Sequence, residues 1–260
     1  MTNSDSNDCY DHPRYWDIAF QDETEDEVEF FEAAFKKYAT IPVRKLLEPG
    51  CGGGRLVIEM ATRGYQVTGF DLSQSMVDYV NQRLEQQKLN AEIFVGDMTK
   101  FELPSSVDAV FNTMNTFRHL VTEEAALSHL HSVAQCLKPG GIFILGFHII
   151  PLDADEEDEE SWTEEDGDTE VKLTLTVADF DREKRLETLR FDLEVNDNGK
   201  ETKISTEYPY RLYTHDQFRS LLNSVPELEL CEVFDFWYEI DHPVPFDHEI
   251  SDAVFVLRKR

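Results

Sequence analysis

The 260-residue chain carries 53 acidic residues against 24 basic ones, a formal net charge of −29. A surface of that sign repels phosphate backbones and anionic lipids, so we expect neither nucleic acid nor a membrane as a partner. The chain has no apolar run of about eighteen residues and no basic-then-apolar amino terminus, which predicts neither a spanning helix nor a secretory signal. These features predict a cytoplasmic protein.

The cysteines are scattered. None forms a C-x-x-C pair, and no group of histidine and cysteine has metal-ligand spacing, so we expect free thiols and no metal site. The four are Cys9, Cys51, Cys136 and Cys231. The chain is long enough to bury a large core, and one α/β domain with an insertion fits its pattern best.

The first part of the chain alternates predicted helices and strands. A capping box, Thr24-x-x-Glu27, predicts the start of one helix, and Ser73 and Thr122 can cap two later ones. The strands are predicted at Leu46–Leu47, Gln66–Asp71, Ala91–Val95, Val107–Asn112 and Ile142–Phe147. Such alternation predicts a doubly wound, mostly parallel sheet.

The alternation stops near Ile149. Residues 153–170 hold 12 acidic residues and no basic one, which predicts a solvated loop. Three runs of β character follow, at Val171–Phe180, Leu186–Val195 and Ile204–Leu212, and they predict an antiparallel meander.

The last segment resumes the first pattern. Thr214 can cap a short helix, and Leu228–Phe236 and Asp252–Leu257 are predicted strands. We therefore expect a core over residues 1–148, an insertion over residues 149–213, and a return to the core sheet over residues 214–260.

A glycine loop leaves the first strand. It reads Glu48-x-Gly50-x-Gly52-x-Gly54, and Asp71 closes the second strand. Glycines at this spacing let the backbone turn sharply and approach a ligand, and a carboxylate at the end of the second strand can accept hydrogen bonds from both ribose hydroxyls. A dinucleotide fingerprint would need glycine where Arg55 stands, which disfavours a nicotinamide oxidoreductase.

These motifs, in this order, resemble the class I S-adenosylmethionine-dependent methyltransferases. Gly96-Asp97-Met98 is similar to the family's third motif, whose acid pairs with the adenine amino group. Val107–Asn112 is similar to its fourth strand, and Leu137–Leu145 to the loop and strand of its fifth. The resemblance implies a Rossmann-like, seven-stranded sheet ending in an antiparallel hairpin, with S-adenosylmethionine as cofactor and S-adenosylhomocysteine as product. The inserted meander looks like the lid sheet that some small-molecule members carry over the acceptor pocket.

The motifs and the resemblance imply a set of cofactor-binding residues. They are Tyr15, Glu48, Gly50, Cys51, Gly52, Gly54, Asp71, Leu72, Gly96, Asp97, Met98 and Asn112. Tyr15 resembles a tyrosine that closes over the cofactor, with packing against the sheet as its alternative. Asp97 has ordinary turn chemistry as its alternative, and Glu48 could hold the loop instead of touching the ligand.

Candidates for catalysis and acceptor binding are fewer. His119 follows the fourth strand and is a candidate general base, the alternative being a hydrogen bond to a loop carbonyl. Arg211, Tyr213, Trp237 and Tyr238 are candidates for lining the acceptor site, with packing as their alternative.

We infer a methyltransferase that acts on nitrogen or oxygen of a small molecule. The segment after the fourth strand lacks the Asn-Pro-Pro-Tyr type signature of enzymes that methylate base amino groups. If the acidic tract covers the mouth of the site, it favours a cationic acceptor. The alternative is a non-catalytic sensor of S-adenosylmethionine or S-adenosylhomocysteine, because nothing in the chain demands catalysis.

Overall fold

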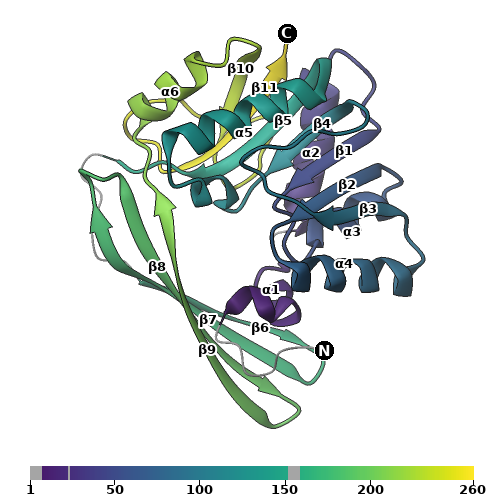
Figure 1. The fold of residues 1–260 in the computed structure, drawn as a ribbon, viewed down its shortest axis with the longest axis vertical. Coiled ribbons are helices and arrows are strands. Elements are labelled where there is room, and N and C mark those ends of the chain that lie inside the picture. Colours follow the sequence, from purple (N-terminus) through teal and green to yellow (C-terminus); the bar gives the residue numbers. More distant parts are fainter. Residues whose placement is uncertain (1–7, 23, 152–158) are drawn as a thin grey trace.

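The computed structural model describes residues 8–22, 24–151 and 159–260. It contains a sheet-and-helix core and a second sheet of long strands that extends away from that core (Figure 1). Among the described residues, no helix has the length and apolar character needed to cross a membrane.

The core sheet has seven strands in the order β10-β11-β5-β4-β1-β2-β3. All neighbours are parallel except β11, which runs antiparallel to both β5 and β10. The predicted doubly wound sheet with a final hairpin is confirmed. Its strands are β1 (Lys45–Pro49), β2 (Gln66–Asp71), β3 (Ala91–Val95), β4 (Val107–Asn112), β5 (Leu137–His148), β10 (Leu228–Phe234) and β11 (Asp252–Lys259).

Helices cover both faces of this sheet. Apolar residues of α2 and α3 share one buried cluster with β1, and those of α5 and α6 share another with β5. The predicted caps Ser73, Thr122 and Thr214 all accept a hydrogen bond from a backbone N–H of the first turn. The helices are α2 (Thr24–Tyr38), α3 (Arg55–Thr62), α4 (Gln74–Gln87), α5 (Glu123–Cys136) and α6 (His215–Asn223).

The predicted capping box at Thr24 is wrong. Thr24 is already the first residue of α2 and not its cap, and its hydroxyl donates to the carbonyl oxygen of Gln21 at 2.8 Å. Glu27 is fully buried and pairs with Arg55 across the α2–α3 contact. A buried carboxylate needs such a partner, so Glu27 is not free to bond back to the helix start.

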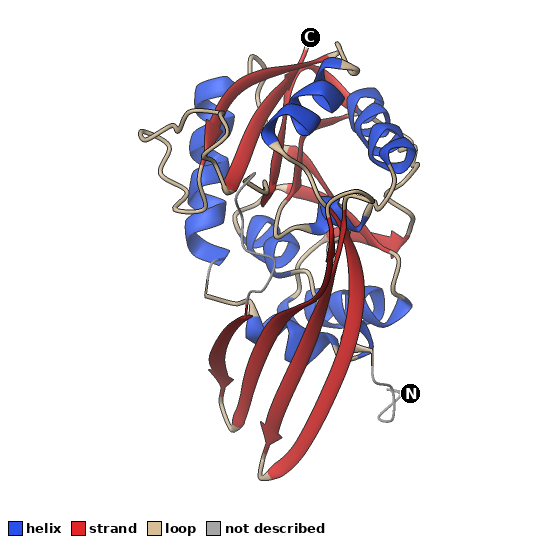
Figure 2. Ribbon diagram, turned by 90° about the vertical axis from the view of Figure 1, so that its left-hand side faces the viewer, coloured by secondary structure: helices blue, strands red, loops and turns tan. Residues whose placement is uncertain are grey.

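The second sheet is antiparallel, in the order β6-β7-β8-β9. Its strands are β6 (Glu159–Asp166), β7 (Thr169–Asp181), β8 (Leu186–Asp197) and β9 (Lys200–Arg211), and they run outward from the core as a long curved sheet (Figure 2).

The acidic tract was predicted as a loop, and from residue 159 onward that prediction is wrong. Residues 153–158 lie outside the described part of the chain. Strand β6 pairs with β7 along its whole length, and Trp162 packs into the cluster beneath it, where its Nε1 donates to the carbonyl oxygen of Ala19 at 2.6 Å. An edge strand can carry many acids because its outward side chains stay in water.

The amino-terminal segment joins the two sheets. It forms the short helix α1 (Pro13–Ala19) after a 3-10 turn, η1 (Cys9–Asp11). Ile18 and Ala19 belong to the apolar cluster of the second sheet, and α1 also contacts α4 of the core. Figure 1 shows α1 between the core and strands β6 and β7. This segment therefore forms one wall of the space between the sheets.

Candidate functional site

A cavity of about 1130 Å³ lies between the carboxyl ends of the core strands and the second sheet. Its core side is formed by the loop after β1, the end of β2, the loop after β3, and a 3-10 turn, η2 (Thr116–His119). Its other walls come from the amino-terminal segment and from the second sheet. Ligands of open α/β sheets bind at this end of the strands.

The loop after β1 has the left-handed backbone that its glycines predict. Gly52 has φ +50° and Gly54 has φ +75°. A Cβ at Gly54 would lie 2.7 Å from the side chain of Val80, whereas one at Gly52 would meet no atom of the described residues within 4 Å. Gly54 is thus needed for packing, and Gly52 leaves open space beside the loop on the wall of the cavity.

Asp71 ties this loop to the end of β2. Its Oδ2 accepts a hydrogen bond from the backbone N–H of Gly52 at 2.8 Å, and its Oδ1 accepts one from Ser73 at 2.9 Å. Burial raises the pKa of Asp71, against the lowering effect of these N–H donors. The next residue, Leu72, lines the cavity with 75% of its surface exposed, which offers an apolar face to a ligand.

Glu48 lines the same wall with its carboxyl group buried. Its Oε2 has no hydrogen-bond partner among the described residues. Burial raises the pKa of Glu48 well above its usual range, and the nearby Arg55 only partly opposes this. Arg55 is itself paired with Glu27. A buried carboxyl oxygen without a partner is costly, so this atom is suited to a donor carried by a ligand.

The other predicted cofactor residues divide into two groups. Those that line the cavity are Gly50, Cys51, Gly96, Asp97 and Met98. Asp97 also has the turn role, because its Oδ1 accepts from the N–H of Thr99 at 2.7 Å. Asn112 is buried behind the loop instead, where its Nδ2 donates to the carbonyl oxygen of Pro49 at 2.7 Å. Asn112 therefore holds the loop in place.

The amino-terminal tyrosine in the cavity is Tyr10, not Tyr15. The Tyr15 hydroxyl lies 3.5 Å from Oδ2 of Asp197 on β8, and its ring stacks on His12, outside the lining of the cavity. Tyr10 lines the cavity. Tyr10 lies in η1 and Tyr15 in α1, and the two side chains have different surroundings.

His119 lies in the cavity wall beside Tyr10. Its Nε2 is 2.9 Å from the Tyr10 hydroxyl, and its ring centroid is 4.5 Å from that of Tyr210. Burial lowers the pKa of His119 to about 4, and the adjacent Arg118 acts in the same direction. The imidazole is therefore neutral at pH 7 and a weak base.

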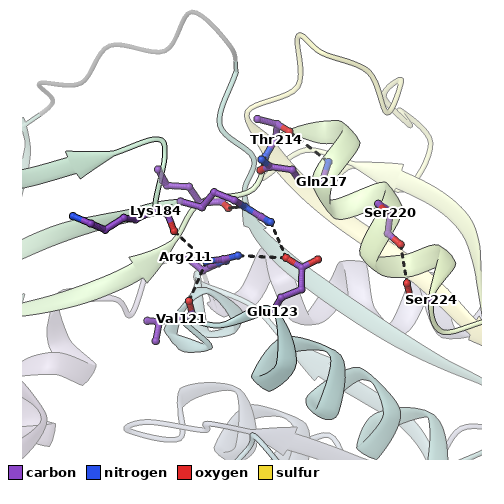
Figure 3. Close-up of polar contacts among 10 residues, drawn as sticks. Val121, Glu123, Lys184, Arg211, Thr214, Gln217, Ser220 and Ser224 are labelled. Carbon is purple, nitrogen blue, oxygen red and sulfur yellow. Dashed lines mark hydrogen bonds and ion pairs between the residues drawn. The ribbon is translucent and has the colours of Figure 1, made fainter.

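The four predicted acceptor residues lie outside the cavity lining. Arg211 joins the end of β9 to the start of α5, through Glu123 and the carbonyl oxygens of Val121 and Lys184 (Figure 3). Tyr213 is fully buried in the core, and Trp237 is 81% exposed. Tyr238 donates to Glu27 beneath α2 at 2.9 Å. The prediction of these four as lining residues is wrong, because packing and ion pairing hold three of them elsewhere and Trp237 points into solvent.

Sequence reasoning missed the residues that form the far wall. Tyr208 and Tyr210 lie two residues apart on β9, so both side chains are on the face of the strand that lines the cavity. Arg211 is on the opposite face. The two-residue spacing of these tyrosines is the feature of the sequence that could have predicted a shared face. The other aromatic lining residues that the sequence did not single out are Trp16, Phe20, Trp162, Phe191 and Phe236.

The cavity lining is strongly acidic. Among the described lining residues, Arg55 is the one lysine or arginine, and Glu27 neutralises it. The lining acids are Asp8, Asp11, Asp17, Asp22, Glu48, Asp71, Asp97, Glu160 and Glu164. Such a lining attracts cations and disfavours ligands that carry phosphate.

Comparisons with known proteins agree with this geometry. Residues 46–141 match a protein family described as a methyltransferase domain. The ubiquinone biosynthesis O-methyltransferase of Alkalilimnicola ehrlichii is 34% identical over 98 residues, which cover 38% of this chain and 39% of that protein. The chain spans less than half the length of the curated relatives cited for it.

Solved structures extend the likeness to the whole fold. An S-adenosylmethionine-dependent methyltransferase from Clostridium acetobutylicum has a TM-score of 0.78 at 15% identity, over 97% of this chain and 99% of that one. CalS10 from Micromonospora echinaspora has a TM-score of 0.74 at 17% identity, over 96% of both chains. The domain match and the glycine loop followed by Asp71 place residues 46–141 in the methyltransferase-domain family, and the solved methyltransferases share the fold of the whole chain.

Proposed function

We propose that this protein transfers a methyl group from S-adenosylmethionine to a nitrogen of a small, cationic amine. The observation that carries the proposal is a single cavity with two kinds of wall. One wall is the loop that ends at Asp71, and the other is an aromatic and acidic surface on the second sheet. Cofactor and acceptor can therefore meet inside one enclosed space.

The polar groups of the first wall complement those of the cofactor. The Asp71 carboxylate has lone pairs beyond the two N–H donors that it already accepts, which suits ribose hydroxyls. The unpartnered Oε2 of Glu48 suits the ammonium group of the methionyl part. Leu72 and Met98 offer apolar surface for the adenine ring. The cofactor supplies an electrophilic methyl group, and the protein orients the acceptor and excludes water.

The groups that line the cavity favour an amine acceptor over an alcohol. A hydroxyl group must lose its proton as it attacks, and His119, with a pKa of about 4, is a poor base for that step. An amine can release its extra proton to solvent before the reaction and then attack through the freed lone pair. The N–CH3 bond forms as the methyl–sulfur bond breaks, and the product nitrogen carries the positive charge. Glu160 and Glu164 on β6 draw the protonated amine into the cavity, and the rings of Trp162 and Tyr210 surround it.

The related proteins support a small acceptor without fixing its atom. CalS10 is described as an amino pentose methyltransferase and was solved with S-adenosylmethionine bound. The Alkalilimnicola relative is an O-methyltransferase. We also place the enzyme in the cytoplasm, where its unpaired cysteines would stay reduced.

A matched panel of acceptors tests this proposal. The purified protein is incubated with S-adenosylmethionine and with small amines, the alcohols of the same shape, and phosphorylated forms of the amines. The assay follows the release of S-adenosylhomocysteine together with the mass of the acceptor. Replacement of a hydrogen by a methyl group raises that mass by about 14 daltons. We expect turnover with amines and little with the other two groups.

Each other outcome has a distinct meaning. Turnover confined to alcohols contradicts the choice of nitrogen. Binding of S-adenosylhomocysteine by calorimetry, without turnover on the amine panel or on a metabolite extract, favours the sensor function instead.

A further inference from the structure

Three potential metal ligands meet at the start of α6, outside the cavity lining. They are His215, Asp216 and His248, and one ligand atom from each lies within 4.8 Å of the other two. His215 is the first residue of α6, after its cap Thr214. His248 comes from the loop between β10 and β11. The cluster therefore joins two segments that are distant along the chain.

His215 is the fixed member of the group. It is 8% exposed, and its ring centroid lies 4.5 Å from that of Phe246 and 4.7 Å from that of His248. Its Nδ1 lies 3.1 Å from Oδ1 of Asp216, while its Nε2 has no hydrogen-bond partner among the described residues. One ring nitrogen of His215 thus already faces a second ligand of the cluster, and the other is buried without a partner in the described part of the chain.

The other two ligands are exposed to solvent. The side chain of Asp216 is 76% exposed, and His248 is exposed as well. In a tetrahedral zinc site with bonds of about 2.0–2.1 Å, neighbouring ligand atoms lie about 3.3 Å apart. The separation of His215 and Asp216 is already close to this value. A rotation of the His248 side chain would close the remaining gap.

We propose that His215, Asp216 and His248 bind a divalent transition-metal ion of the zinc class. Two imidazoles and one carboxylate are ligands that such ions prefer, and the exposed side of the cluster leaves the fourth position to water. Ions that prefer an all-oxygen shell, such as Mg²⁺ and Ca²⁺, are poor matches. The ion would fasten the β10–β11 loop to α6, so its role is structural.

Binding of zinc itself provides the first test. The full chain is stripped of metal with a chelator, dialysed, and titrated with Zn²⁺ in competition with a chromophoric chelator. We expect one site, with His248→Ala and Asp216→Asn each weakening binding by about tenfold or more. Both side chains are exposed, so these variants should keep the fold. His242→Ala is the matched control, because His242 lies in the same loop beside Glu239 but outside the cluster.

Two further measurements make the outcome decisive. Co²⁺ bound at the site should give the visible bands of a tetrahedral complex, and these should vanish in His248→Ala. Zn²⁺ should raise the melting temperature of the parent and of His242→Ala, and not that of His248→Ala. Equal zinc affinity in the parent and in His248→Ala would overturn the proposal, as would equal stabilisation by Mg²⁺, which would indicate general attraction of cations to an acidic surface.

Discussion

Glu48 shows how one side chain can link cofactor binding to stability. Its carboxyl group is buried, and within the described part of the chain one of its oxygens has no hydrogen-bond partner. Burial favours the protonated form, so the folded protein keeps the Glu48 proton to a higher pH than the unfolded chain does. An ammonium group placed beside this carboxyl would stabilise the ionised form and release the proton.

The Glu48→Gln variant tests this link. Above the ordinary pKa of 4.5, the unfolded chain loses the Glu48 proton while the folded protein retains it, so the parent loses stability as pH rises toward the folded pKa. Glutamine has no proton to lose. Melting temperatures between pH 4 and pH 8 should therefore shift in favour of the variant as pH rises, whatever the offset at pH 4. A pH-independent difference would contradict the raised pKa.

The same variant should bind S-adenosylhomocysteine more weakly at pH 7.5. A charge-assisted hydrogen bond contributes roughly 1.5–3 kcal/mol, so calorimetry should show a loss of about tenfold or more. Unchanged affinity would mean that Glu48 only holds the loop, which is the alternative that its position before Pro49 allows.

His119 is the second residue whose role can be measured directly. With its pKa near 4, it should give no inflection between pH 6 and 8 in the rate of methyl transfer. The His119→Asn variant should lose less than about tenfold in kcat, because removal of a true general base typically costs 10²- to 10⁴-fold. A loss in that range, together with the disappearance of an inflection near neutrality, would make His119 the base.

At the scale of elements, one buried ion pair connects the two sheets. Arg118 on η2 lies 2.5 Å from Glu187 on β8, and both side chains are almost fully buried. Arg118 also donates to the carbonyl oxygen of Arg211 at 3.0 Å. This contact fixes the second sheet relative to the catalytic end of the core.

The Arg118→Met variant should unfold more easily by about 3–5 kcal/mol, because it leaves the Glu187 charge buried and unpaired. The double variant Arg118→Met with Glu187→Gln should recover part of this loss. Chemical denaturation of the parent, both single variants and the double variant measures the coupling. Additive effects would show that the pair contributes no net interaction.

The elements differ in how far the sequence predicts them. The bounds predicted for β2, β3 and β4 match the structure because each is a short apolar run between clear turn or helix signals. Strand β6 was missed because Trp162 is its one large apolar residue among acids, too weak a periodic signal. The glycine loop and Asp71 line the cavity as neighbours because they are local to β1 and β2. The residues of the acceptor wall were not predicted, since which side chains face the cavity depends on how the second sheet packs against the core.

The proposed metal site illustrates the same limit. His215 and His248 lie on different elements, so no spacing in the sequence relates them. Tyr10 likewise reaches the cavity through the docking of the amino-terminal segment against β9. Local patterns predict elements and the turns between them, whereas side chains brought together by packing must be found in the folded molecule.

For the whole molecule, we propose that the core binds the cofactor and that residues 149–213 cover the acceptor. The backbone N–H of Ile150 donates to the carbonyl oxygen of Tyr213 at 2.8 Å, so the insertion leaves and re-enters the core at adjacent points. A short Gly/Ser linker can therefore replace residues 151–212. The core sheet keeps all seven of its strands in such a variant.

We expect this variant to melt cooperatively and to bind S-adenosylhomocysteine while methylating nothing. Asp71, Glu48 and the glycine loop stay in the core, whereas Tyr208, Tyr210 and the acids of β6 are lost with the acceptor wall. Affinity should fall somewhat, because Ile18 and Ala19 lose the apolar cluster that holds α1. Calorimetry and the amine assay, run beside the parent, separate the two effects. A folded variant that binds no cofactor would show that the second sheet, through α1 and Tyr10, builds the nucleoside pocket itself.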